Sequence, residues 1–233
     1  MSGEVCLITG VGPGTGSALV RAFAGAGYRV AMLARSRERL EALAFDIPEA
    51  HAFPCDVSDT DALARTVAEI TATLGAPRVV VHNAVGGAFA DFLQADPAVL
   101  ERNFQVNVMA LFHLARLTTP AMIAAGEGAL ICTGNTSAYR GKANFAAFAP
   151  TKAAQRVLME SIARRIGPEG VHAAYVAVDA VIDVPWTRAA MKDKPDDFFC
   201  KPDDIAAECL RIARQPKSAW SFNVEIRPFA EPW

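Results

Sequence analysis

The chain has 233 residues, a length that favours one large domain over two, and 52% of them are apolar while 21% are charged. That balance excludes a disordered or low-complexity protein. Lysine and arginine total 23 and aspartate and glutamate total 25, so the net charge of −2 gives no general attraction to nucleic acid or to an acidic membrane surface.

The cysteines and the start of the chain point to a cellular compartment. Five cysteines, an odd number, form no CxxC pair, which argues against a disulfide framework and against a zinc cluster. The first residues lack a basic signal-like segment, and no apolar run approaches the length of about 18 residues that a membrane-spanning helix needs. We therefore expect a soluble protein of the reducing cytoplasm, with no bound metal, no nucleic-acid partner and no membrane partner.

Seven β-favouring apolar runs recur along the chain, and segments with helical periodicity separate most of them. The runs are Val5–Thr9, Tyr28–Ala34, His51–Cys55, Arg78–His82, Ala129–Thr133, Val171–Val178 and Phe222–Ile226. Because the runs are almost continuously apolar, we expect strands that are buried on both faces. The pattern predicts an α/β fold, a single doubly wound Rossmann domain over residues 1–233, with a seven-stranded, mostly parallel sheet and helices on both faces.

The two longest helices are expected from Pro97 to about Ala125 and from Phe145 to about Ile166. Ser58 is expected to cap the helix that follows it. Segment 185–202, rich in Lys, Asp and Pro, departs from the alternation of strand and helix, and we interpret it as a substrate lid. Its aromatic residues are Trp186, Phe198 and Phe199.

The first predicted strand leads directly into a glycine-rich loop and then into a helix. The loop reads Thr9-Gly10-Val11-Gly12-Pro13-Gly14-Thr15-Gly16. Gly10 would permit a sharp turn, Gly14 a close approach of a pyrophosphate, and Gly16 tight packing of the helix on the strand. The alternative is a purely structural turn. The candidate cofactor-binding residues of the loop are Gly10, Gly14, Thr15 and Gly16.

About twenty residues further on, the second predicted strand ends at a position where a dinucleotide fold usually carries an acidic residue for the adenosine ribose. Here the residue is Arg35. A guanidinium can bind a 2′-phosphate that a carboxylate would repel, and Ser36 can add a donor. NADP(H) is therefore favoured over NAD(H). The alternative is that the arginines of this segment, Arg37 and Arg39 at least, belong to a solvated helix face.

With these motifs in view, the chain resembles a short-chain dehydrogenase/reductase over nearly all of its length. The glycine loop is similar to the cofactor loop of that family, and Asp56-Val57 is similar to its adenine contact. Asn83-Ala84 resembles the family signature after the fourth strand, and Asn107 matches the asparagine of a central helix. The resemblance implies that Asp56, Val57, Asn83 and Ala84 also contact the cofactor.

The resemblance breaks at the catalytic positions. In the family, a Tyr and a Lys four residues later do the chemistry, with a Ser thirteen residues before the Tyr. Lys152 is in place, but Phe148 stands where the Tyr belongs and Asn135 where the Ser belongs. The chain thus resembles an atypical subgroup with Phe for Tyr, and the implied catalytic set is Asn107, Asn135, Phe148 and Lys152. Lys152 can also bind the nicotinamide ribose, so it is a cofactor-binding candidate as well.

Phe148 has no proton to donate, and the loss of a general acid typically costs about 10²- to 10⁴-fold in rate. The nicotinamide end departs from the family too, because Asp179-Ala180 replaces a Pro-Gly and Val184 replaces a Thr. An aspartate buried beside the nicotinamide would have a raised pKa and could supply the proton. The candidate replacement acids are Tyr139, Ser137, Asp179 and Asp183.

Two functions follow. The first is an NADP(H)-dependent oxidoreductase of altered mechanism, acting on a small or medium apolar carbonyl, alcohol or activated alkene held beneath the aromatic residues of the lid. The alternative is a catalytically inactive NADP(H)-binding sensor or partner protein.

The chain is expected to form a homodimer or a homotetramer. The two long predicted helices present small and apolar residues beyond what one sheet face covers, and in the family these helices pair across a two-fold axis. The residues concerned are Ala110, Leu114, Val157 and Leu158. Phe229 and Trp233 are expected to seal a sheet edge or a subunit contact.

Overall fold

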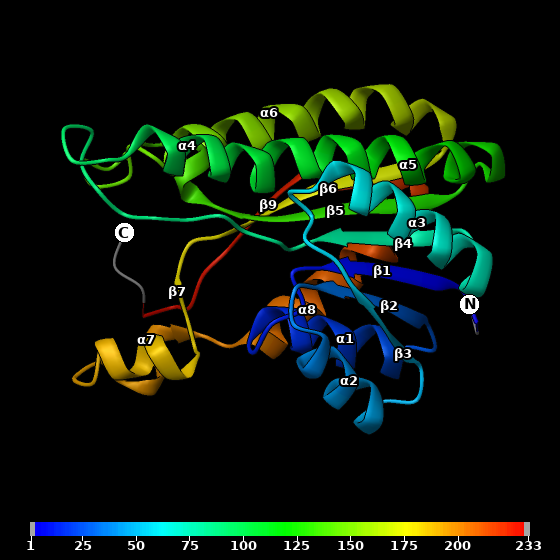
Figure 1. Ribbon diagram of the computed structural model, residues 1–233, viewed down its shortest axis with the longest axis horizontal. Coiled ribbons are helices and arrows are strands. Elements are labelled where there is room, and N and C mark those ends of the chain that lie inside the picture. The colour runs from blue at the N-terminus through cyan, green and yellow to red at the C-terminus, as the bar shows by residue number, and fades with distance from the viewer. Residues whose placement is uncertain (1–2, 231–233) are drawn as a thin grey trace.

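One seven-stranded sheet lies between two layers of helices in the structure, a computed structural model that describes residues 3–230 (Figure 1). The strand order is β3-β2-β1-β4-β5-β6-β9, and every pairing is parallel. The strands are β1 Val5–Thr9, β2 Arg29–Ala34, β3 Ala50–Pro54, β4 Pro77–His82, β5 Gly128–Asn135, β6 Val171–Val178 and β9 Asn223–Ile226. Each overlaps a predicted apolar run, and the predicted doubly wound fold is confirmed.

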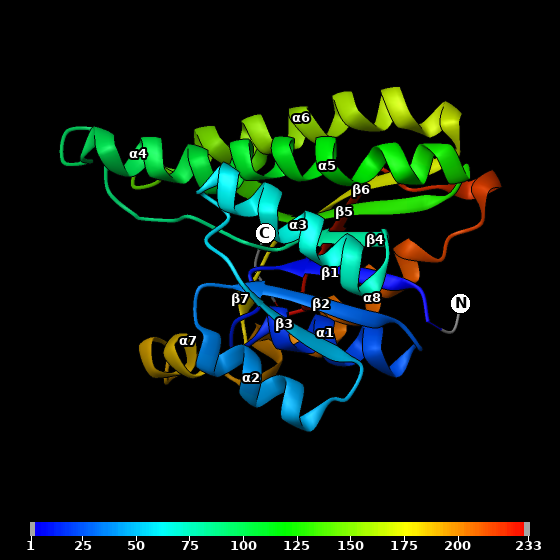
Figure 2. The ribbon, with the colours of Figure 1, turned by 45° about the vertical axis from the view of Figure 1, so that its right-hand side comes forward.

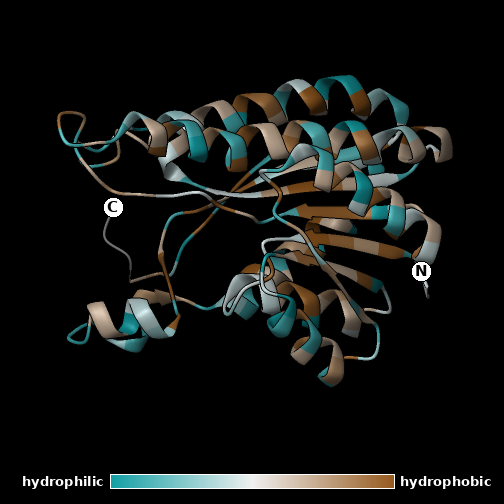
Figure 3. Cartoon of the chain, viewed as in Figure 1, coloured by the Kyte–Doolittle hydropathy of each residue, from teal (hydrophilic) through white to brown (hydrophobic). Residues whose placement is uncertain are grey.

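The two helical layers bury the two faces of the sheet (Figure 2). One layer contains α3 Thr60–Leu74, α4 Pro97–Phe104, α5 Ala110–Ala125 and α6 Ala149–Ile166, and the other contains α1 Thr15–Gly25, α2 Arg37–Asp46 and α8 Pro202–Ala213. Successive strand residues serve opposite cores: Leu7 faces α3, α5 and α6, whereas Ile8 faces α1 and α8. Figure 3 shows the resulting apolar centre of the sheet.

A π-helical turn, Gln105–Met109, joins α4 to α5, so the helix predicted from Pro97 to Ala125 is continuous. By length and composition this helix could cross a membrane, since an 18-residue window in it has a mean hydropathy of 1.4. The prediction that no apolar run approaches this length is therefore wrong. Part of this apolar character belongs to the core, because Leu111 and Met122 are buried in the cluster between the helices and the sheet.

The expectation that Ala110 and Leu114 lie on an exposed face is also wrong, since both are fully buried. Val157 on α6 is exposed as expected, and Leu158 is partly buried against the core. Two further apolar side chains, Phe112 and Leu117 on α5, are also exposed.

Two helix starts differ from the prediction for local reasons. Helix α6 begins at Ala149 rather than Phe145, because Pro150 has no N–H and is best placed in the first turn. Helix α3 is capped by Asp59, whose carboxylate accepts hydrogen bonds from the backbone N–H groups of the first turn at 3.1 and 2.9 Å. The hydroxyl of Ser58, the predicted cap, instead donates to Asp56 at 2.7 Å.

The predicted lid is a folded unit beyond the carboxyl edge of the sheet, set apart from the helical layers (Figure 1). It contains α7 Pro185–Ala190 and β8 Phe199–Cys200, and β8 pairs in parallel with β7 Val181–Ile182, which precedes the predicted segment. Arg188 holds it together, with two hydrogen bonds of 2.7 Å to Asp183 and one of 2.6 Å to Asp196. Phe198 and Phe199 are buried, so of the three aromatic residues expected above the substrate only Trp186 is exposed.

Candidate cofactor and active site

The glycine loop between β1 and α1 has no room for side chains at three of its positions. Gly10 has a φ of +71°, and a Cβ there would lie 2.5 Å from the backbone of Ala84. A Cβ on Gly16 would overlap the carbonyl oxygen of Gly10. Gly14 has a φ of +119°, and its Cβ would meet the side chain of Val184 at 2.7 Å. The loop therefore requires glycine both for its path and for its packing.

The start of α1 offers an unused donor. The hydroxyl of Thr15, the first residue of α1, is buried and has no hydrogen-bond partner within residues 3–230. A buried polar group without a partner is costly, and the N-terminus of a helix attracts an anion. The residues present therefore fit the diphosphate of a dinucleotide at this end of the sheet.

Asn83 connects the carboxyl ends of β1, β4 and β5 by hydrogen bonds. Its side chain donates to the carbonyl of Gly10 at 2.9 Å and accepts from the hydroxyl of Thr133 at 2.9 Å. The backbone N–H groups of Asn83 and Ala84 both donate to the hydroxyl of Thr9, which leaves that hydroxyl to donate to His82 Nδ1 at 3.0 Å. Burial lowers the pKa of His82 to about 3, so this imidazole is neutral and structural.

The predicted adenosine-binding residues lie beyond β2 and β3. Arg35 is exposed and forms no ion pair within the described chain, whereas Arg37 pairs with Glu41 at 3.3 Å along the solvated face of α2. The Ser36 hydroxyl caps α2 by accepting from a backbone N–H at 3.3 Å.

Asp56 and Val57 follow β3 at the same edge of the sheet. Burial opposes ionisation of Asp56, but hydrogen bonds from Ser58 and the charge of Arg35 outweigh it and hold the pKa of Asp56 below its usual range. The side chain of Val57 is buried. Arg35 thus lies near enough to an ionised carboxylate to influence it, and its own guanidinium stays exposed.

Lys152, on the first turn of α6, is only 2% exposed. Its Nζ donates to Gln155 Oε1 at 2.6 Å and lies 5.9 Å from the centroid of the Phe148 ring. Burial lowers the pKa of Lys152 to about 8. The structure therefore brings two of the predicted catalytic positions, Phe148 and Lys152, together in an apolar setting.

Phe148 belongs to an aromatic cluster with Phe89 and Phe145. The ring centroids of Phe89 and Phe148 lie 5.8 Å apart, and those of Phe145 and Phe148 lie 6.0 Å apart. Phe148 itself is buried, while Phe89 is 66% exposed on the loop after β4. The position where the family has a proton donor is thus part of an apolar wall.

The side chain of Asn107, in the π-helical turn, holds the loop after β4. It donates to the carbonyl of Gly86 and to the hydroxyl of Thr151, each at 2.8 Å, and accepts from the N–H of Gly86 at 2.9 Å. Within the described residues, neither amide atom of Asn107 hydrogen-bonds to Lys152 or Phe148. The side chain of Asn107 therefore fixes the loop after β4 against the start of α6.

Asn135, at the end of β5, accepts from the N–H of Ser137 at 3.2 Å and so caps the 3-10 turn Thr136–Ala138. Its amide nitrogen makes no hydrogen bond within the described residues and remains available as a donor. The backbone N–H of Asn135 donates to the hydroxyl of Tyr175 at 3.3 Å. Tyr175 reaches it across Gly134, where a Cβ would overlap the phenol ring.

Three of the four candidate replacement acids have hydrogen-bond or ion-pair partners away from Lys152. The expectation of a raised pKa is wrong for Asp183, because the two hydrogen bonds from Arg188 hold its pKa below the usual range. Asp179 accepts from the Thr136 hydroxyl and pairs with Arg140 at 3.2 Å.

Of the remaining two candidates, one has a hydrogen-bond partner elsewhere and the other is buried. Tyr139 donates its hydroxyl hydrogen to Asn223 on β9 at 2.6 Å, and Ser137 is buried. Among residues 3–230, none of these four side chains bonds to Lys152.

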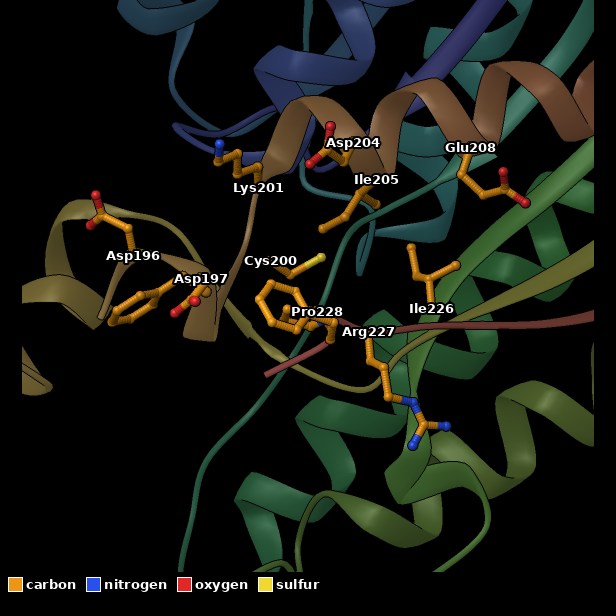
Figure 4. Close-up of a pocket in the computed structure, with 12 residues that line it drawn as sticks. Asp196, Asp197, Cys200, Lys201, Asp204, Ile205, Glu208, Ile226, Arg227 and Pro228 are labelled. Carbon is orange, nitrogen blue, oxygen red and sulfur yellow. The ribbon is translucent and has the colours of Figure 1, made fainter. Parts of the chain in front are cut away.

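A cavity of about 550 Å³ lies elsewhere, between α8, β8 and the segment after β9 (Figure 4). Asp204 and Glu208 line it from α8 and Lys201 from the residue before that helix, and Arg227 and Pro228 form the opposite wall. Its lining includes no residue of the glycine loop or of α6, so we assign neither cofactor nor chemistry to it.

Three further expectations concern the C-terminal aromatic residues, metal ligands and the cysteines. Phe229 is 88% exposed at the rim of this cavity, and Trp233, the other residue expected to seal an edge, lies outside the described residues. Within residues 3–230, no three His, Cys, Asp or Glu side chains come together as metal ligands. All five cysteines are free and buried.

The fold and this edge of the sheet define a Rossmann-type protein with a glycine loop suited to a dinucleotide. The family model for short chain dehydrogenase matches residues 4–194, and the chain belongs to the short-chain dehydrogenase/reductase family of oxidoreductases. It is 30% identical to the D-erythrulose reductase of Gallus gallus over 218 residues, covering 89% of this chain and 87% of that protein.

Two further relatives, one matched by sequence and one by structure, are also oxidoreductases. The L-xylulose reductase of Bos taurus is 26% identical over 194 residues, covering 83% of this chain and 78% of that protein. A metagenomic short-chain oxidoreductase solved in complex with NADP superposes with a TM-score of 0.86 and 30% identity, covering 99% of both chains.

Sequence reasoning missed two residues that support the candidate site. Gln155 bonds to Lys152, and Tyr175 bonds to the backbone of Asn135. For Gln155 there was a signal: it is a polar residue three positions after Lys152 and four before the buried Met159, on the core face of a helix. Tyr175 gave none, because a tyrosine in an apolar run is usually packing.

Proposed function

We propose that this protein is an NADP(H)-dependent oxidoreductase that works without the tyrosine acid of its family, as a member of an atypical subgroup with Phe for Tyr. The observation that carries the proposal is the pairing of a complete glycine loop and a buried Lys152 with a Phe148 ring that has no proton to give. Its substrate is a small or medium apolar carbonyl, alcohol or activated alkene, held against the aromatic cluster Phe89, Phe145 and Phe148.

The roles of the binding residues follow from their chemistry. The glycine loop and Thr15 would hold the diphosphate, and Arg35 would hold a 2′-phosphate through charge-assisted hydrogen bonds. Lys152 would donate to the nicotinamide ribose. When bound, the cofactor supplies or accepts a hydride. A relative of 30% identity solved with NADP supports the choice of cofactor.

Proton supply separates the substrate classes. Reduction of a ketone leaves an alkoxide, which needs an acid, and in this chain the amide nitrogen of Asn135 can donate only a hydrogen bond. Reduction of an activated alkene leaves a delocalised enolate, a weaker base that solvent can protonate. We therefore place activated alkenes ahead of simple ketones as substrates.

Turnover of NADPH with a panel of alkenes and ketones, together with NADPH binding, tests this proposal. We expect consumption of NADPH with an activated alkene and little with simple ketones. Tight NADPH binding with no turnover on any substrate would favour the alternative, a catalytically inactive sensor or partner protein.

Assembly and location are part of the same proposal. Phe112 and Leu117 on α5 and Val157 on α6 are exposed apolar side chains, and we propose that these two helices pair two copies in a homodimer or homotetramer. The five free cysteines accord with a cytoplasmic location.

A further inference from the structure

Gln155 is a fully buried polar side chain on α6, and the proposed function gives it no part. Its amide bridges two groups: Oε1 accepts from Lys152 Nζ at 2.6 Å, and Nε2 donates to the main-chain carbonyl of Asn107 at 2.7 Å. An ammonium can only donate and a carbonyl can only accept, so the two partners fix which end of the amide faces which. The bridge therefore has one orientation.

The far end of this bridge is itself immobilised. The carbonyl of Asn107 lies in the π-helical turn between α4 and α5, and the side chain of Asn107 is bonded to Gly86 and Thr151. The hydroxyl of Thr151 in turn donates to the carbonyl of Phe148 at 2.8 Å. Gln155 thus connects Lys152 to a closed network of buried hydrogen bonds, which holds its members rigidly.

Lys152 has no charged neighbour that would position it instead. The groups facing it are Cys132 on β5, His82 on β4 and the Phe148 ring. Burial raises the pKa of Cys132 to about 12 and lowers that of His82 to about 3, so both are neutral at pH 7. Within the described residues, Gln155 is the hydrogen-bond acceptor that directs this ammonium.

We propose that Gln155 is a positioning residue that clamps the Lys152 ammonium to the Asn107 carbonyl and leaves its other N–H donors for the ribose hydroxyls of the cofactor. An amide carries no proton at neutral pH, so the clamp makes Lys152 a fixed donor and passes no proton between Lys152 and Asn107. The two hydrogen bonds of Gln155 make up the clamp. Only its role in directing Lys152 toward the cofactor ribose rests on the proposed function.

The clamp is tested in the cofactor-free, full-length protein by following the ¹³Cε signal of Lys152 against pH, with the signal assigned from its absence in Lys152→Met. Gln155→Glu keeps an acceptor and adds a negative charge, so it should raise the Lys152 midpoint by one pH unit or more. Gln155→Leu removes the acceptor of the charged form and should lower the midpoint. An unchanged midpoint in both variants overturns the proposal.

Gln215→Leu is the matched control. Gln215 also uses both ends of its amide, since Oε1 accepts from the N–H of Ser221 at 2.8 Å and Nε2 donates to the Ser221 hydroxyl at 3.1 Å. It lies beyond α8 and touches neither Lys152 nor Asn107, so the Lys152 midpoint should stay where the wild type has it. Gln155→Glu preserves the size of the side chain and keeps the test decisive if Gln155→Leu does not fold.

NADPH affinity at pH 7 supplies the second measurement. Gln155→Leu should weaken binding about tenfold, the effect of one misdirected charge-assisted hydrogen bond, whereas Gln215→Leu should change it less than about twofold. Shifted midpoints with unchanged NADPH affinity overturn the positioning role. A wild-type protein that binds no NADPH overturns the proposed function instead, and the titration still decides whether the clamp exists.

Discussion

At position 148 a buried phenylalanine ring lies 5.9 Å from the ammonium of Lys152. The loss of a general acid at such a position raises the barrier by roughly 3 to 5 kcal/mol, the equivalent of about 10²- to 10⁴-fold in rate. The rest of the local network is intact, because Lys152, Gln155, Asn107 and Thr151 are joined by hydrogen bonds. The residue-level evidence therefore favours retained binding with altered proton chemistry.

At the same scale, the proposed preference for NADP(H) is assigned to Arg35. NADPH should bind at least about tenfold more tightly than NADH, because the exposed guanidinium can form charge-assisted hydrogen bonds to a 2′-phosphate. Arg35→Asp should abolish or reverse this preference in titrations of both cofactors. Arg37→Asp, which removes a side chain already paired with Glu41, should leave it unchanged. Equal affinities in the wild type would contradict the assignment.

At the scale of the element, the glycine loop should respond to substitution according to its geometry. Gly10→Ala forces a side chain onto a φ of +71° and into the backbone of Ala84, so it should lower the free energy of unfolding by about 2 kcal/mol or more. A Cβ on Gly12 would have no atom within 4 Å, so Gly12→Ala should change the free energy of unfolding by less than about 0.5 kcal/mol. Urea denaturation of both variants measures the difference, and equal losses would show that the loop does not depend on this path.

The elements also show which information the sequence carries. Strands and the glycine loop could be predicted because their signals are local: apolar runs, turn residues and their order. Periodicity misplaces the start of α6, because Pro150 favours the first turn of the helix and periodicity does not register that preference. The exposed face of α5 was misassigned because that helix is apolar on both sides, and periodicity cannot then tell which side meets the sheet.

The bonds that build the candidate site depend on contacts between distant residues. Gln155 meets Asn107 across 48 positions, and Tyr175 meets Asn135 across 40. No local pattern encodes such pairs, since the fold alone brings them together. The sequence therefore predicts which residue types occupy the site, and the structure supplies how they are held.

At the scale of the whole molecule, the exposed apolar side chains Phe112, Leu117 and Val157 on α5 and α6 predict self-association. Light scattering at micromolar concentration should give at least twice the chain mass of 24.8 kDa. Val157→Glu should shift the particle toward the monomer, because it places a charge in the proposed contact. Phe45→Glu, at an apolar position on α2 that is even more exposed than Val157, should not. A 24.8 kDa wild-type particle would refute the proposed contact.

The central claim is that this protein binds NADP(H) but lacks the acid for ordinary ketone reduction. The most direct test is the rate of NADPH-dependent reduction of one ketone by the wild type and by Phe148→Tyr/Asn135→Ser. The double variant restores a phenol beside Lys152 and a hydroxyl that can polarise the carbonyl, so its kcat/KM should exceed that of the wild type by about two orders of magnitude or more. A wild type that already reduces the ketone at ordinary rates, and keeps that rate in Phe148→Ala, would contradict the account.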